Sequence, residues 1–157
     1  MNPIVGFLNF MGKMGLTLRG DPPRKINVEG RVWGEEAGGV VLSIREIANS
    51  DPAQLPAISV VMKNVGSATR KLTIPGWMFF YQVETPQPLT AFGRQLLMPE
   101  RRRERLEISL GPGDATETDV PVAQLYEMRA RGEYPLRVSC TLEDGVVVRS
   151  NQIVIRR

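Results

Sequence analysis

Residues 133–142, EYPLRVSCTL, indicate the fold class most clearly, because apolar and polar side chains alternate along them. One face of this segment carries Tyr134, Leu136, Val138, Cys140 and Leu142. A period of two is typical of a β-strand with one buried face, since successive side chains point to opposite sides of a sheet. We therefore expect a strand over residues 134–142 whose apolar face lies in the core.

Asp144 and Gly145 follow this strand, and this pair suits a tight turn because glycine accepts a positive φ. The next stretch, VVVRSNQIVI at residues 146–155, is again rich in β-branched side chains. We expect the two segments to form an antiparallel hairpin.

The same rhythm extends back to residue 26, with short apolar stretches separated by turn residues about every ten positions. The expected strands cover residues 26–33, 40–47, 57–65, 77–85, 106–110, 116–120, 134–142 and 146–155. Residues 122–128, VAQLYEM, suit one short helical turn. This pattern, with 15 glycines and 12 prolines, predicts an all-β antiparallel sandwich.

Length and charge divide the chain of 157 residues into an arm, residues 1–25, and one domain, residues 26–157. The arm holds four basic residues against Asp21, whereas the domain holds 16 basic and 16 acidic residues. A nucleic-acid-binding domain usually carries a basic surface of its own, so we expect no nucleic-acid partner.

The arm has the pattern of an amphipathic helix, with an apolar stripe within about 120° of a helical wheel. The stripe consists of Ile4, Phe7, Leu8, Met11, Met14 and Leu18, while Asn9, Lys13 and Thr17 fall on the opposite side. Three glycines weaken this helix by about 1 kcal/mol each relative to alanine, so it needs a surface to pack on. The sequence leaves open whether that surface belongs to its own domain, to a partner protein or to a membrane.

The arm lacks the features of a cleavable signal peptide, because Asn9 and Lys13 interrupt its apolar stretch and its first charge comes late. The sequence contains no stretch of about 18 apolar residues, so it predicts no transmembrane helix. These features favour a cytoplasmic location or peripheral attachment to a membrane.

Residues 110–155 combine a Pro112-Gly113 turn, a Leu125-Tyr126 segment and a strand with Gly132, Tyr134 and Val138. With VMKNVG at residues 61–66, this pattern resembles bacterial immunoglobulin-like β-sandwich domains. The layout of about residues 33–157 is also similar to the intracellular proteinase-inhibitor domain. The resemblance implies an immunoglobulin-like sandwich with a binding or accessory role and no active site to carry over. Relatives often follow a signal peptide or lipoprotein leader, and the arm departs from that pattern.

The absence of histidine excludes Ser-His-Asp and Cys-His nucleophilic sites and histidine-based metal sites. We expect Cys140 to be a small core residue, and Tyr134 to form a tyrosine corner with nearby backbone. We also expect Trp33 and Trp77 to pack in the core or on a sheet. No phosphate-binding glycine loop occurs, and we expect no cofactor, metal or catalytic residue.

Two further segments are candidates for contact with a partner. Residues 77–81, WMFFY, are apolar on both faces of the expected strand, which predicts a second cover over it. Residues 99–107, PERRRERLE, alternate in charge and suit either a solvated loop or a rim for acidic groups. The candidate partner-binding residues are therefore the six of the arm stripe together with Trp77, Met78, Phe80, Arg101, Arg102 and Arg103.

The sequence thus favours a non-enzymatic protein-interaction subunit, a peripheral component of a larger complex, docked through its arm; a membrane-associated complex is one of the options that the arm leaves open. The alternative is a protease-inhibitor-like or ligand-binding module that uses loops such as residues 86–97. A hydrolase that uses the carboxylates of Asp114, Glu117 and Asp119 is the third and least favoured hypothesis.

Overall fold

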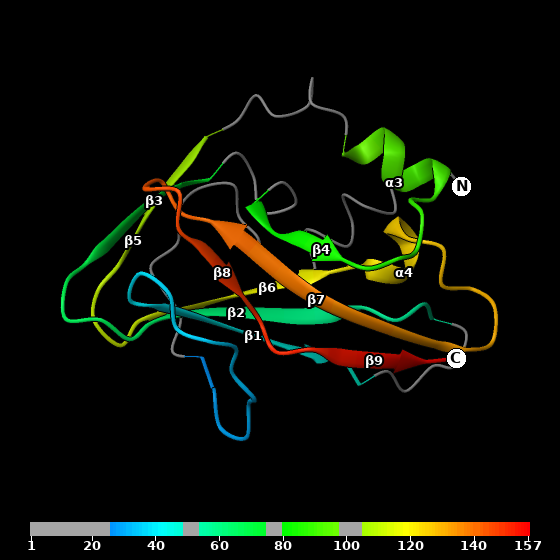
Figure 1. Ribbon diagram of the computed structural model, residues 1–157, viewed down its shortest axis with the longest axis horizontal. Helices are drawn as coiled ribbons and strands as arrows, with labels where there is room; N and C mark the ends of the chain where they lie inside the picture. Colours follow the sequence, from blue (N-terminus) through cyan, green and yellow to red (C-terminus); the bar gives the residue numbers. More distant parts are fainter. Residues whose placement is uncertain (1–25, 49–53, 75–79, 98–104) are drawn as a thin grey trace.

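The structure, a computed structural model, describes residues 26–48, 54–74, 80–97 and 105–157 (Figure 1). Its strands are β1 (Val40–Glu46), β2 (Ile58–Asn64), β3 (Arg70–Ile74), β4 (Gln82–Glu84), β5 (Leu106–Leu110), β6 (Ala115–Val120), β7 (Glu133–Thr141), β8 (Val147–Arg149) and β9 (Ile153–Arg156). The short helices α3 (Ala91–Leu96) and α4 (Val122–Leu125) interrupt the strands. The ladders between these strands are antiparallel, which confirms the predicted all-β antiparallel class.

The strands form three sets. One sheet has the order β1-β2-β6, a pair joins β3 to β5, and β7 pairs with β4, β8 and β9. In Figure 1, β7 and β8 cross in front of β2 and β6. The core fills the space between these two layers.

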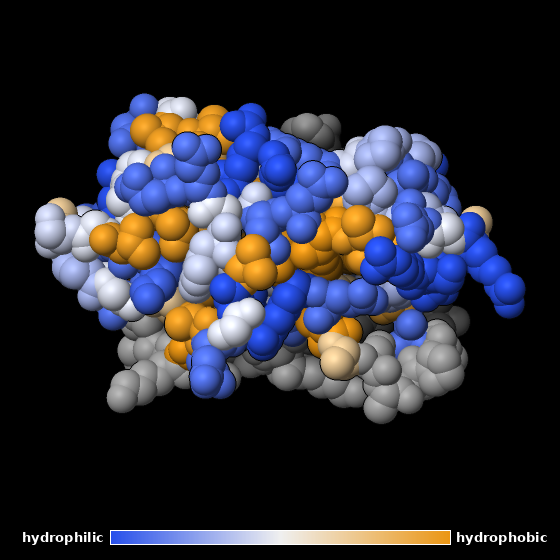
Figure 2. Space-filling view, turned by 60° about the horizontal axis from the view of Figure 1, so that its bottom comes forward, coloured by the Kyte–Doolittle hydropathy of each residue, from blue (hydrophilic) through white to orange (hydrophobic). Residues whose placement is uncertain are grey.

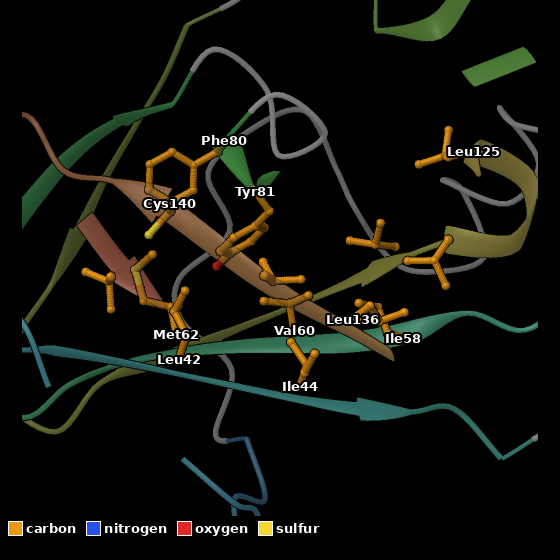
Figure 3. Packing of buried hydrophobic residues seen from close by; sticks show 14 of the residues in the cluster. Leu42, Ile44, Ile58, Val60, Met62, Phe80, Tyr81, Leu125, Leu136 and Cys140 are labelled. Atoms are coloured by element: carbon orange, nitrogen blue, oxygen red, sulfur yellow. The ribbon is translucent and has the colours of Figure 1, made fainter. Parts of the chain in front are cut away.

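Side chains from both layers meet in this core (Figure 3). Leu42 and Val60 point toward β7, whose Leu136 and Cys140 point back at them. The apolar face predicted for β7 is confirmed, because Tyr134, Leu136, Val138, Cys140 and Leu142 are all buried. The hairpin at Asp144-Gly145 is confirmed as well, with Gly145 at a φ of 82°.

The predicted strand over residues 26–33 is wrong. Gly30 has a φ of 73°, and the Arg31 amide donates to the Val28 carbonyl, so the chain turns here before a ladder begins. The predicted strand over residues 77–85 is reduced to β4 within the described residues, and residues 77–79 lie outside them.

The predicted strand over residues 146–155 is divided into β8 and β9 by Ser150 and Asn151. The Ser150 hydroxyl accepts the Val138 amide, and the Asn151 side chain accepts from the Ile44 amide and donates to the Ile44 carbonyl. At the break, Ser150 therefore bonds to β7 and Asn151 bonds to β1. The sequence rhythm could not reveal this, because the partners are distant in the chain.

Two elements were not predicted, β3 and α3. Helix α3 begins after Thr90, whose hydroxyl accepts the Gly93 amide as an N-cap and donates to the Gln124 carbonyl at 2.6 Å. Gly93 packs against the Leu125 carbonyl so closely that a Cβ would collide with it. In contrast, the helical turn predicted within residues 122–128 is confirmed as α4.

Candidate interaction surface

Most of the predicted partner-binding residues lie outside the described part of the chain. This applies to Ile4, Phe7, Leu8, Met11, Met14, Leu18, Trp77, Met78, Arg101, Arg102 and Arg103. Their roles remain predictions.

Phe80 is the described member of the set, and it is a core residue. Its exposed fraction is 8%, and its ring meets that of Tyr81 edge-on with centroids 5.2 Å apart. We therefore remove Phe80 from the candidate partner surface, since a partner would not reach a ring packed in this way.

Exposed apolar side chains do not gather into one patch among the described residues. The large ones are Val32, Val65 and Val147, which lie in three different segments. On the face that Figure 2 shows, apolar residues form separate patches between charged ones. Scattered apolar residues of this kind are normal on protein surfaces and do not mark an interface.

The outward face of the β1-β2-β6 sheet has a different character. Val40, Leu42 and Ile44 belong to the core, so the alternate residues of β1 point away from it, and the same holds for β2. Of these outward side chains, Ser43 and Val61 have an exposed fraction of 0% and Ser59 one of 3%. The centre of this outward face is thus covered, whereas Arg45 on the same face is exposed.

Arg31 lies on this face with a side chain whose exposed fraction is 0%. Its guanidinium donates to the Ser43 carbonyl at 3.3 Å, to the Ser59 hydroxyl and to Glu117 Oε1 at 3.3 Å. The Ser59 hydroxyl in turn donates to Glu117 Oε1 at 2.6 Å. This arrangement anchors the segment that follows the arm to all three strands of the sheet.

The charges of this cluster are only partly compensated. Burial, and next the nearby Arg45, lower the pKa of Arg31 despite the attraction of Glu117 and Asp119. Burial and the nearby Glu117 raise the pKa of Asp119, while Arg31 opposes that rise. Burial of these charges carries a desolvation cost, against which the hydrogen bonds of Arg31 and Ser59 act.

Gly34 fixes the other end of the same segment. A Cβ on Gly34 would collide with the Arg149 carbonyl and with the Ser150 backbone, and the Gly34 amide donates to the Leu42 carbonyl at 2.8 Å. Residues 31–34 are thereby held between the edge of β1 and the end of β8. We call residues 26–36 the strap.

The other residues considered for chemistry have structural roles. Asp114 accepts the Gly111 amide at 2.9 Å within a turn, and Glu117 belongs to the Arg31 cluster. Cys140 is buried, and burial raises its pKa to about 12, which confirms the prediction of a core cysteine. The Tyr134 hydroxyl donates to the Ala130 carbonyl at 2.6 Å, as predicted for a tyrosine corner.

The segment proposed as a binding loop, residues 86–97, is only partly an irregular loop. Its last part is helix α3, which Thr90 and Gly93 fix against α4. Ala91, Arg94 and Gln95 remain exposed on this helix. We call helices α3 and α4, together with the turn that joins β4 to α3, the helical corner.

Sequence reasoning missed Arg31 and Ser59 as members of a site. The spacing of Glu117 and Asp119 by two residues does place both carboxylates on one face of β6. Nothing in the sequence indicates that Arg31 lies opposite them, because it is 28 and 86 residues from Ser59 and Glu117.

No family model and no curated protein matches this chain. Within the described residues, no helix is both long and apolar enough to cross a membrane. The same residues contain no group of three or more Cys, Asp or Glu side chains arranged to hold a metal ion.

Proposed function

We propose that this protein is a non-enzymatic interaction subunit, an immunoglobulin-like β-sandwich that joins a larger assembly by docking its N-terminal arm on a partner protein. The sandwich assignment is supported by two antiparallel layers around one core and by the Tyr134 corner. The resemblance of residues 33–157 to bacterial immunoglobulin-like domains points the same way.

The observation that carries the proposal is the anchored strap. Arg31 binds all three strands of the β1-β2-β6 sheet, so the described chain is fixed five residues after its start at Ile26. An amphipathic arm that starts from a fixed place loses less entropy on docking than one on a free linker. The strap would therefore keep a partner that binds the arm close to the surface of the domain.

The test compares co-purification of native complexes by the full chain and by a chain that lacks residues 1–20. A matched pair of full-length chains refines it, with Phe7→Asp and Met11→Asp on the apolar stripe and Asn9→Asp and Thr17→Asp opposite it. We expect the truncation and the stripe variant to lose the same identified partner while the control retains it. Retention of that partner by the truncated chain at unchanged affinity would overturn the proposal.

Membrane attachment is the other outcome for the arm. Flotation with vesicles of phosphatidylcholine and phosphatidylserine separates it from docking on a protein. If the full chain floats, and the stripe variant does not, the arm binds lipid and the protein-partner proposal fails.

The helical corner supports the alternative function, a protease-inhibitor-like or ligand-binding module. Rigid presentation of exposed residues lowers the entropy cost of binding, and Thr90 and Gly93 hold α3 in this way. This alternative is favoured if the double variant Arg94→Ala with Gln95→Ala loses binding while the arm variants retain it. Retention of binding by that chain, with loss through the stripe variant, would exclude it.

A further inference from the structure

The β1-β2-β6 sheet has two edges, and the chain occupies the one formed by β1. There the Gly34 amide donates to the Leu42 carbonyl at 2.8 Å. The Asn151 side chain accepts from the Ile44 amide at 2.8 Å and donates to the Ile44 carbonyl at 3.0 Å. The backbone groups at the outer edge of β1 therefore have partners from the strap and from the break between β8 and β9.

The opposite edge is formed by β6, which pairs with β2 on one side (Figure 1). The Asn64 amide donates to the Asp114 carbonyl at 2.9 Å, and the alternation of an antiparallel ladder then directs the backbone groups of the even-numbered residues of β6 toward β2. The N–H and C=O groups of Ala115, Glu117 and Asp119 therefore point away from β2. None of residues 26–48, 54–74, 80–97 and 105–157 forms a hydrogen bond with these groups.

A strand edge of this kind is a template for another extended segment, because its N–H and C=O groups can continue the ladder. Strand β6 has six residues, ATETDV, and contains no proline that would remove a donor. Six residues in an extended conformation span about 20 Å. An added strand can therefore pair along all of β6.

The charge along this edge determines which segment fits. Glu117 and Asp119 lie on one face of β6, and Glu117 keeps an exposed fraction of 37% although it binds Arg31. Asp119 is half-buried and forms no hydrogen bond or ion pair with another residue of the described chain. Burial and the nearby Glu117 raise its pKa. A basic side chain beside Asp119 would offset the repulsion between the two carboxylates.

We propose that the free edge of β6 binds an extended basic segment of a partner protein as an added strand, with lysine or arginine at alternate positions beside Glu117 and Asp119. The same charges disfavour a second copy of this chain. In an antiparallel pair of two β6 strands these carboxylates would face one another, and like charges opposite each other are destabilising. This surface is separate from the arm, so the proposal does not rest on the proposed function.

The test uses the full chain and a capped peptide, Thr-Lys-Val-Lys-Val-Lys-Thr, as the probe. Hydrogen exchange followed by NMR reports on the amides of Ala115, Glu117 and Asp119. In the free chain we expect these amides to exchange faster than those of the even-numbered residues of β6. Saturating peptide should slow them at least about tenfold, while the same peptide with glutamate in place of lysine should not.

Two methylated forms of the peptide test whether binding uses the backbone. One carries N-methyl groups on its lysines and the other on its valines. Only alternate amides of a strand point to one neighbour, so we expect one form to lose binding and the other to keep it. Loss or retention by both forms would overturn the proposal, and so would failure of the unmethylated peptide to bind.

Two results for the free chain also overturn the proposal. Slow exchange of these amides at every protein concentration would mean that the chain itself covers the edge. Slow exchange only at high concentration would mean that a second copy does.

A matched pair of variants tests the role of charge. Asp119→Asn should weaken binding of the lysine peptide about two- to fivefold, because it removes one carboxylate beside the added strand. Glu107→Gln makes the same change of charge at an exposed position of β5 and should leave the affinity unchanged. Equal affinities of the two variants would contradict recognition by charge at this edge.

Discussion

The outward faces of the two main sheets differ in burial, although both belong to antiparallel layers around one core. On the β1-β2-β6 sheet the outward Ser43, Ser59 and Val61 are buried, and a charge pair lies among them. On the sheet of β7 the outward Arg149 pairs with Glu84, and the exposed fractions of these two side chains are 55% and 41%. Two ion pairs of equal length, 3.3 Å, thus lie in very different surroundings.

This difference shows that the distance between two charges does not determine how much their pair contributes to stability. Water screens an exposed pair, which therefore contributes about 0–1 kcal/mol to stability. Removal of one partner from a buried pair causes a large loss of stability, because the other charge remains buried without a partner or solvent. The covered face is therefore where substitutions should have the larger effects.

Arg31→Ala should give the largest loss. It removes the anchor of the strap and leaves Glu117 and Ser59 without their donor, so we expect unfolding in urea to show a loss of about 2–3 kcal/mol. The partial exposure of Glu117 keeps the loss below that of a fully buried pair. Arg45→Ala, exposed on the same face, is the control and should stay within about 0.5 kcal/mol of the parent. Equal effects of the two substitutions would show that burial does not distinguish these arginines.

Gly34→Ala should rank second. The new Cβ would collide with backbone atoms of Arg149 and Ser150, which cannot move aside as a side chain would, and we expect a loss of about 1–3 kcal/mol. Gly132→Ala is the matched control, because its Cβ would meet only the Tyr134 ring at an ordinary distance of 3.8 Å. Thermal unfolding of both chains measures the difference, and a Gly34→Ala chain as stable as the control would contradict the close packing of the strap.

Asp119→Asn should have a smaller effect, of opposite sign, that depends on pH. The folded state raises the pKa of Asp119 above 3.8, so ionisation of this carboxyl costs stability once the pH rises through the folded pKa. Asparagine resembles the protonated form, and the variant should unfold at a higher temperature than the parent at pH 7. The gain should disappear below the unfolded pKa, where both chains carry a neutral group. A gain that persists at pH 3 would assign the effect to another cause.

Arg149→Ala should have the smallest effect. It breaks the exposed pair with Glu84 on the other sheet, and we expect a change within about 0.5 kcal/mol in urea unfolding. The change should also vanish in 1 M NaCl, which screens exposed charges. A loss as large as that of Arg31→Ala would remove the distinction between the two faces.

The sequence predicted the elements whose evidence is local. The alternation of residues 134–142, the Asp144-Gly145 turn and the helical turn after Val122 all appear in the structure, since each depends on neighbouring residues. The stretches VVLSIRE and ISVVMKN were predicted as strands, but they are buried on both faces, and periodicity alone cannot show the second cover. Helix α3 was missed because Thr90 and Gly93 form it with help from α4, 32 or more residues away.

The sequence by itself determined that this protein is an all-β chain with a core cysteine, a tyrosine corner and no histidine chemistry, and it predicts an amphipathic arm that carries the net charge. These properties follow from composition and from side-chain periods of 2 and 3.6, which local geometry imposes. The tertiary structure alone decided that Arg31 crosses three strands to reach Ser59 and Glu117, and that the outward face beneath it is covered. Burial of a charge depends on which distant segments meet, and no local pattern in the chain encodes that meeting.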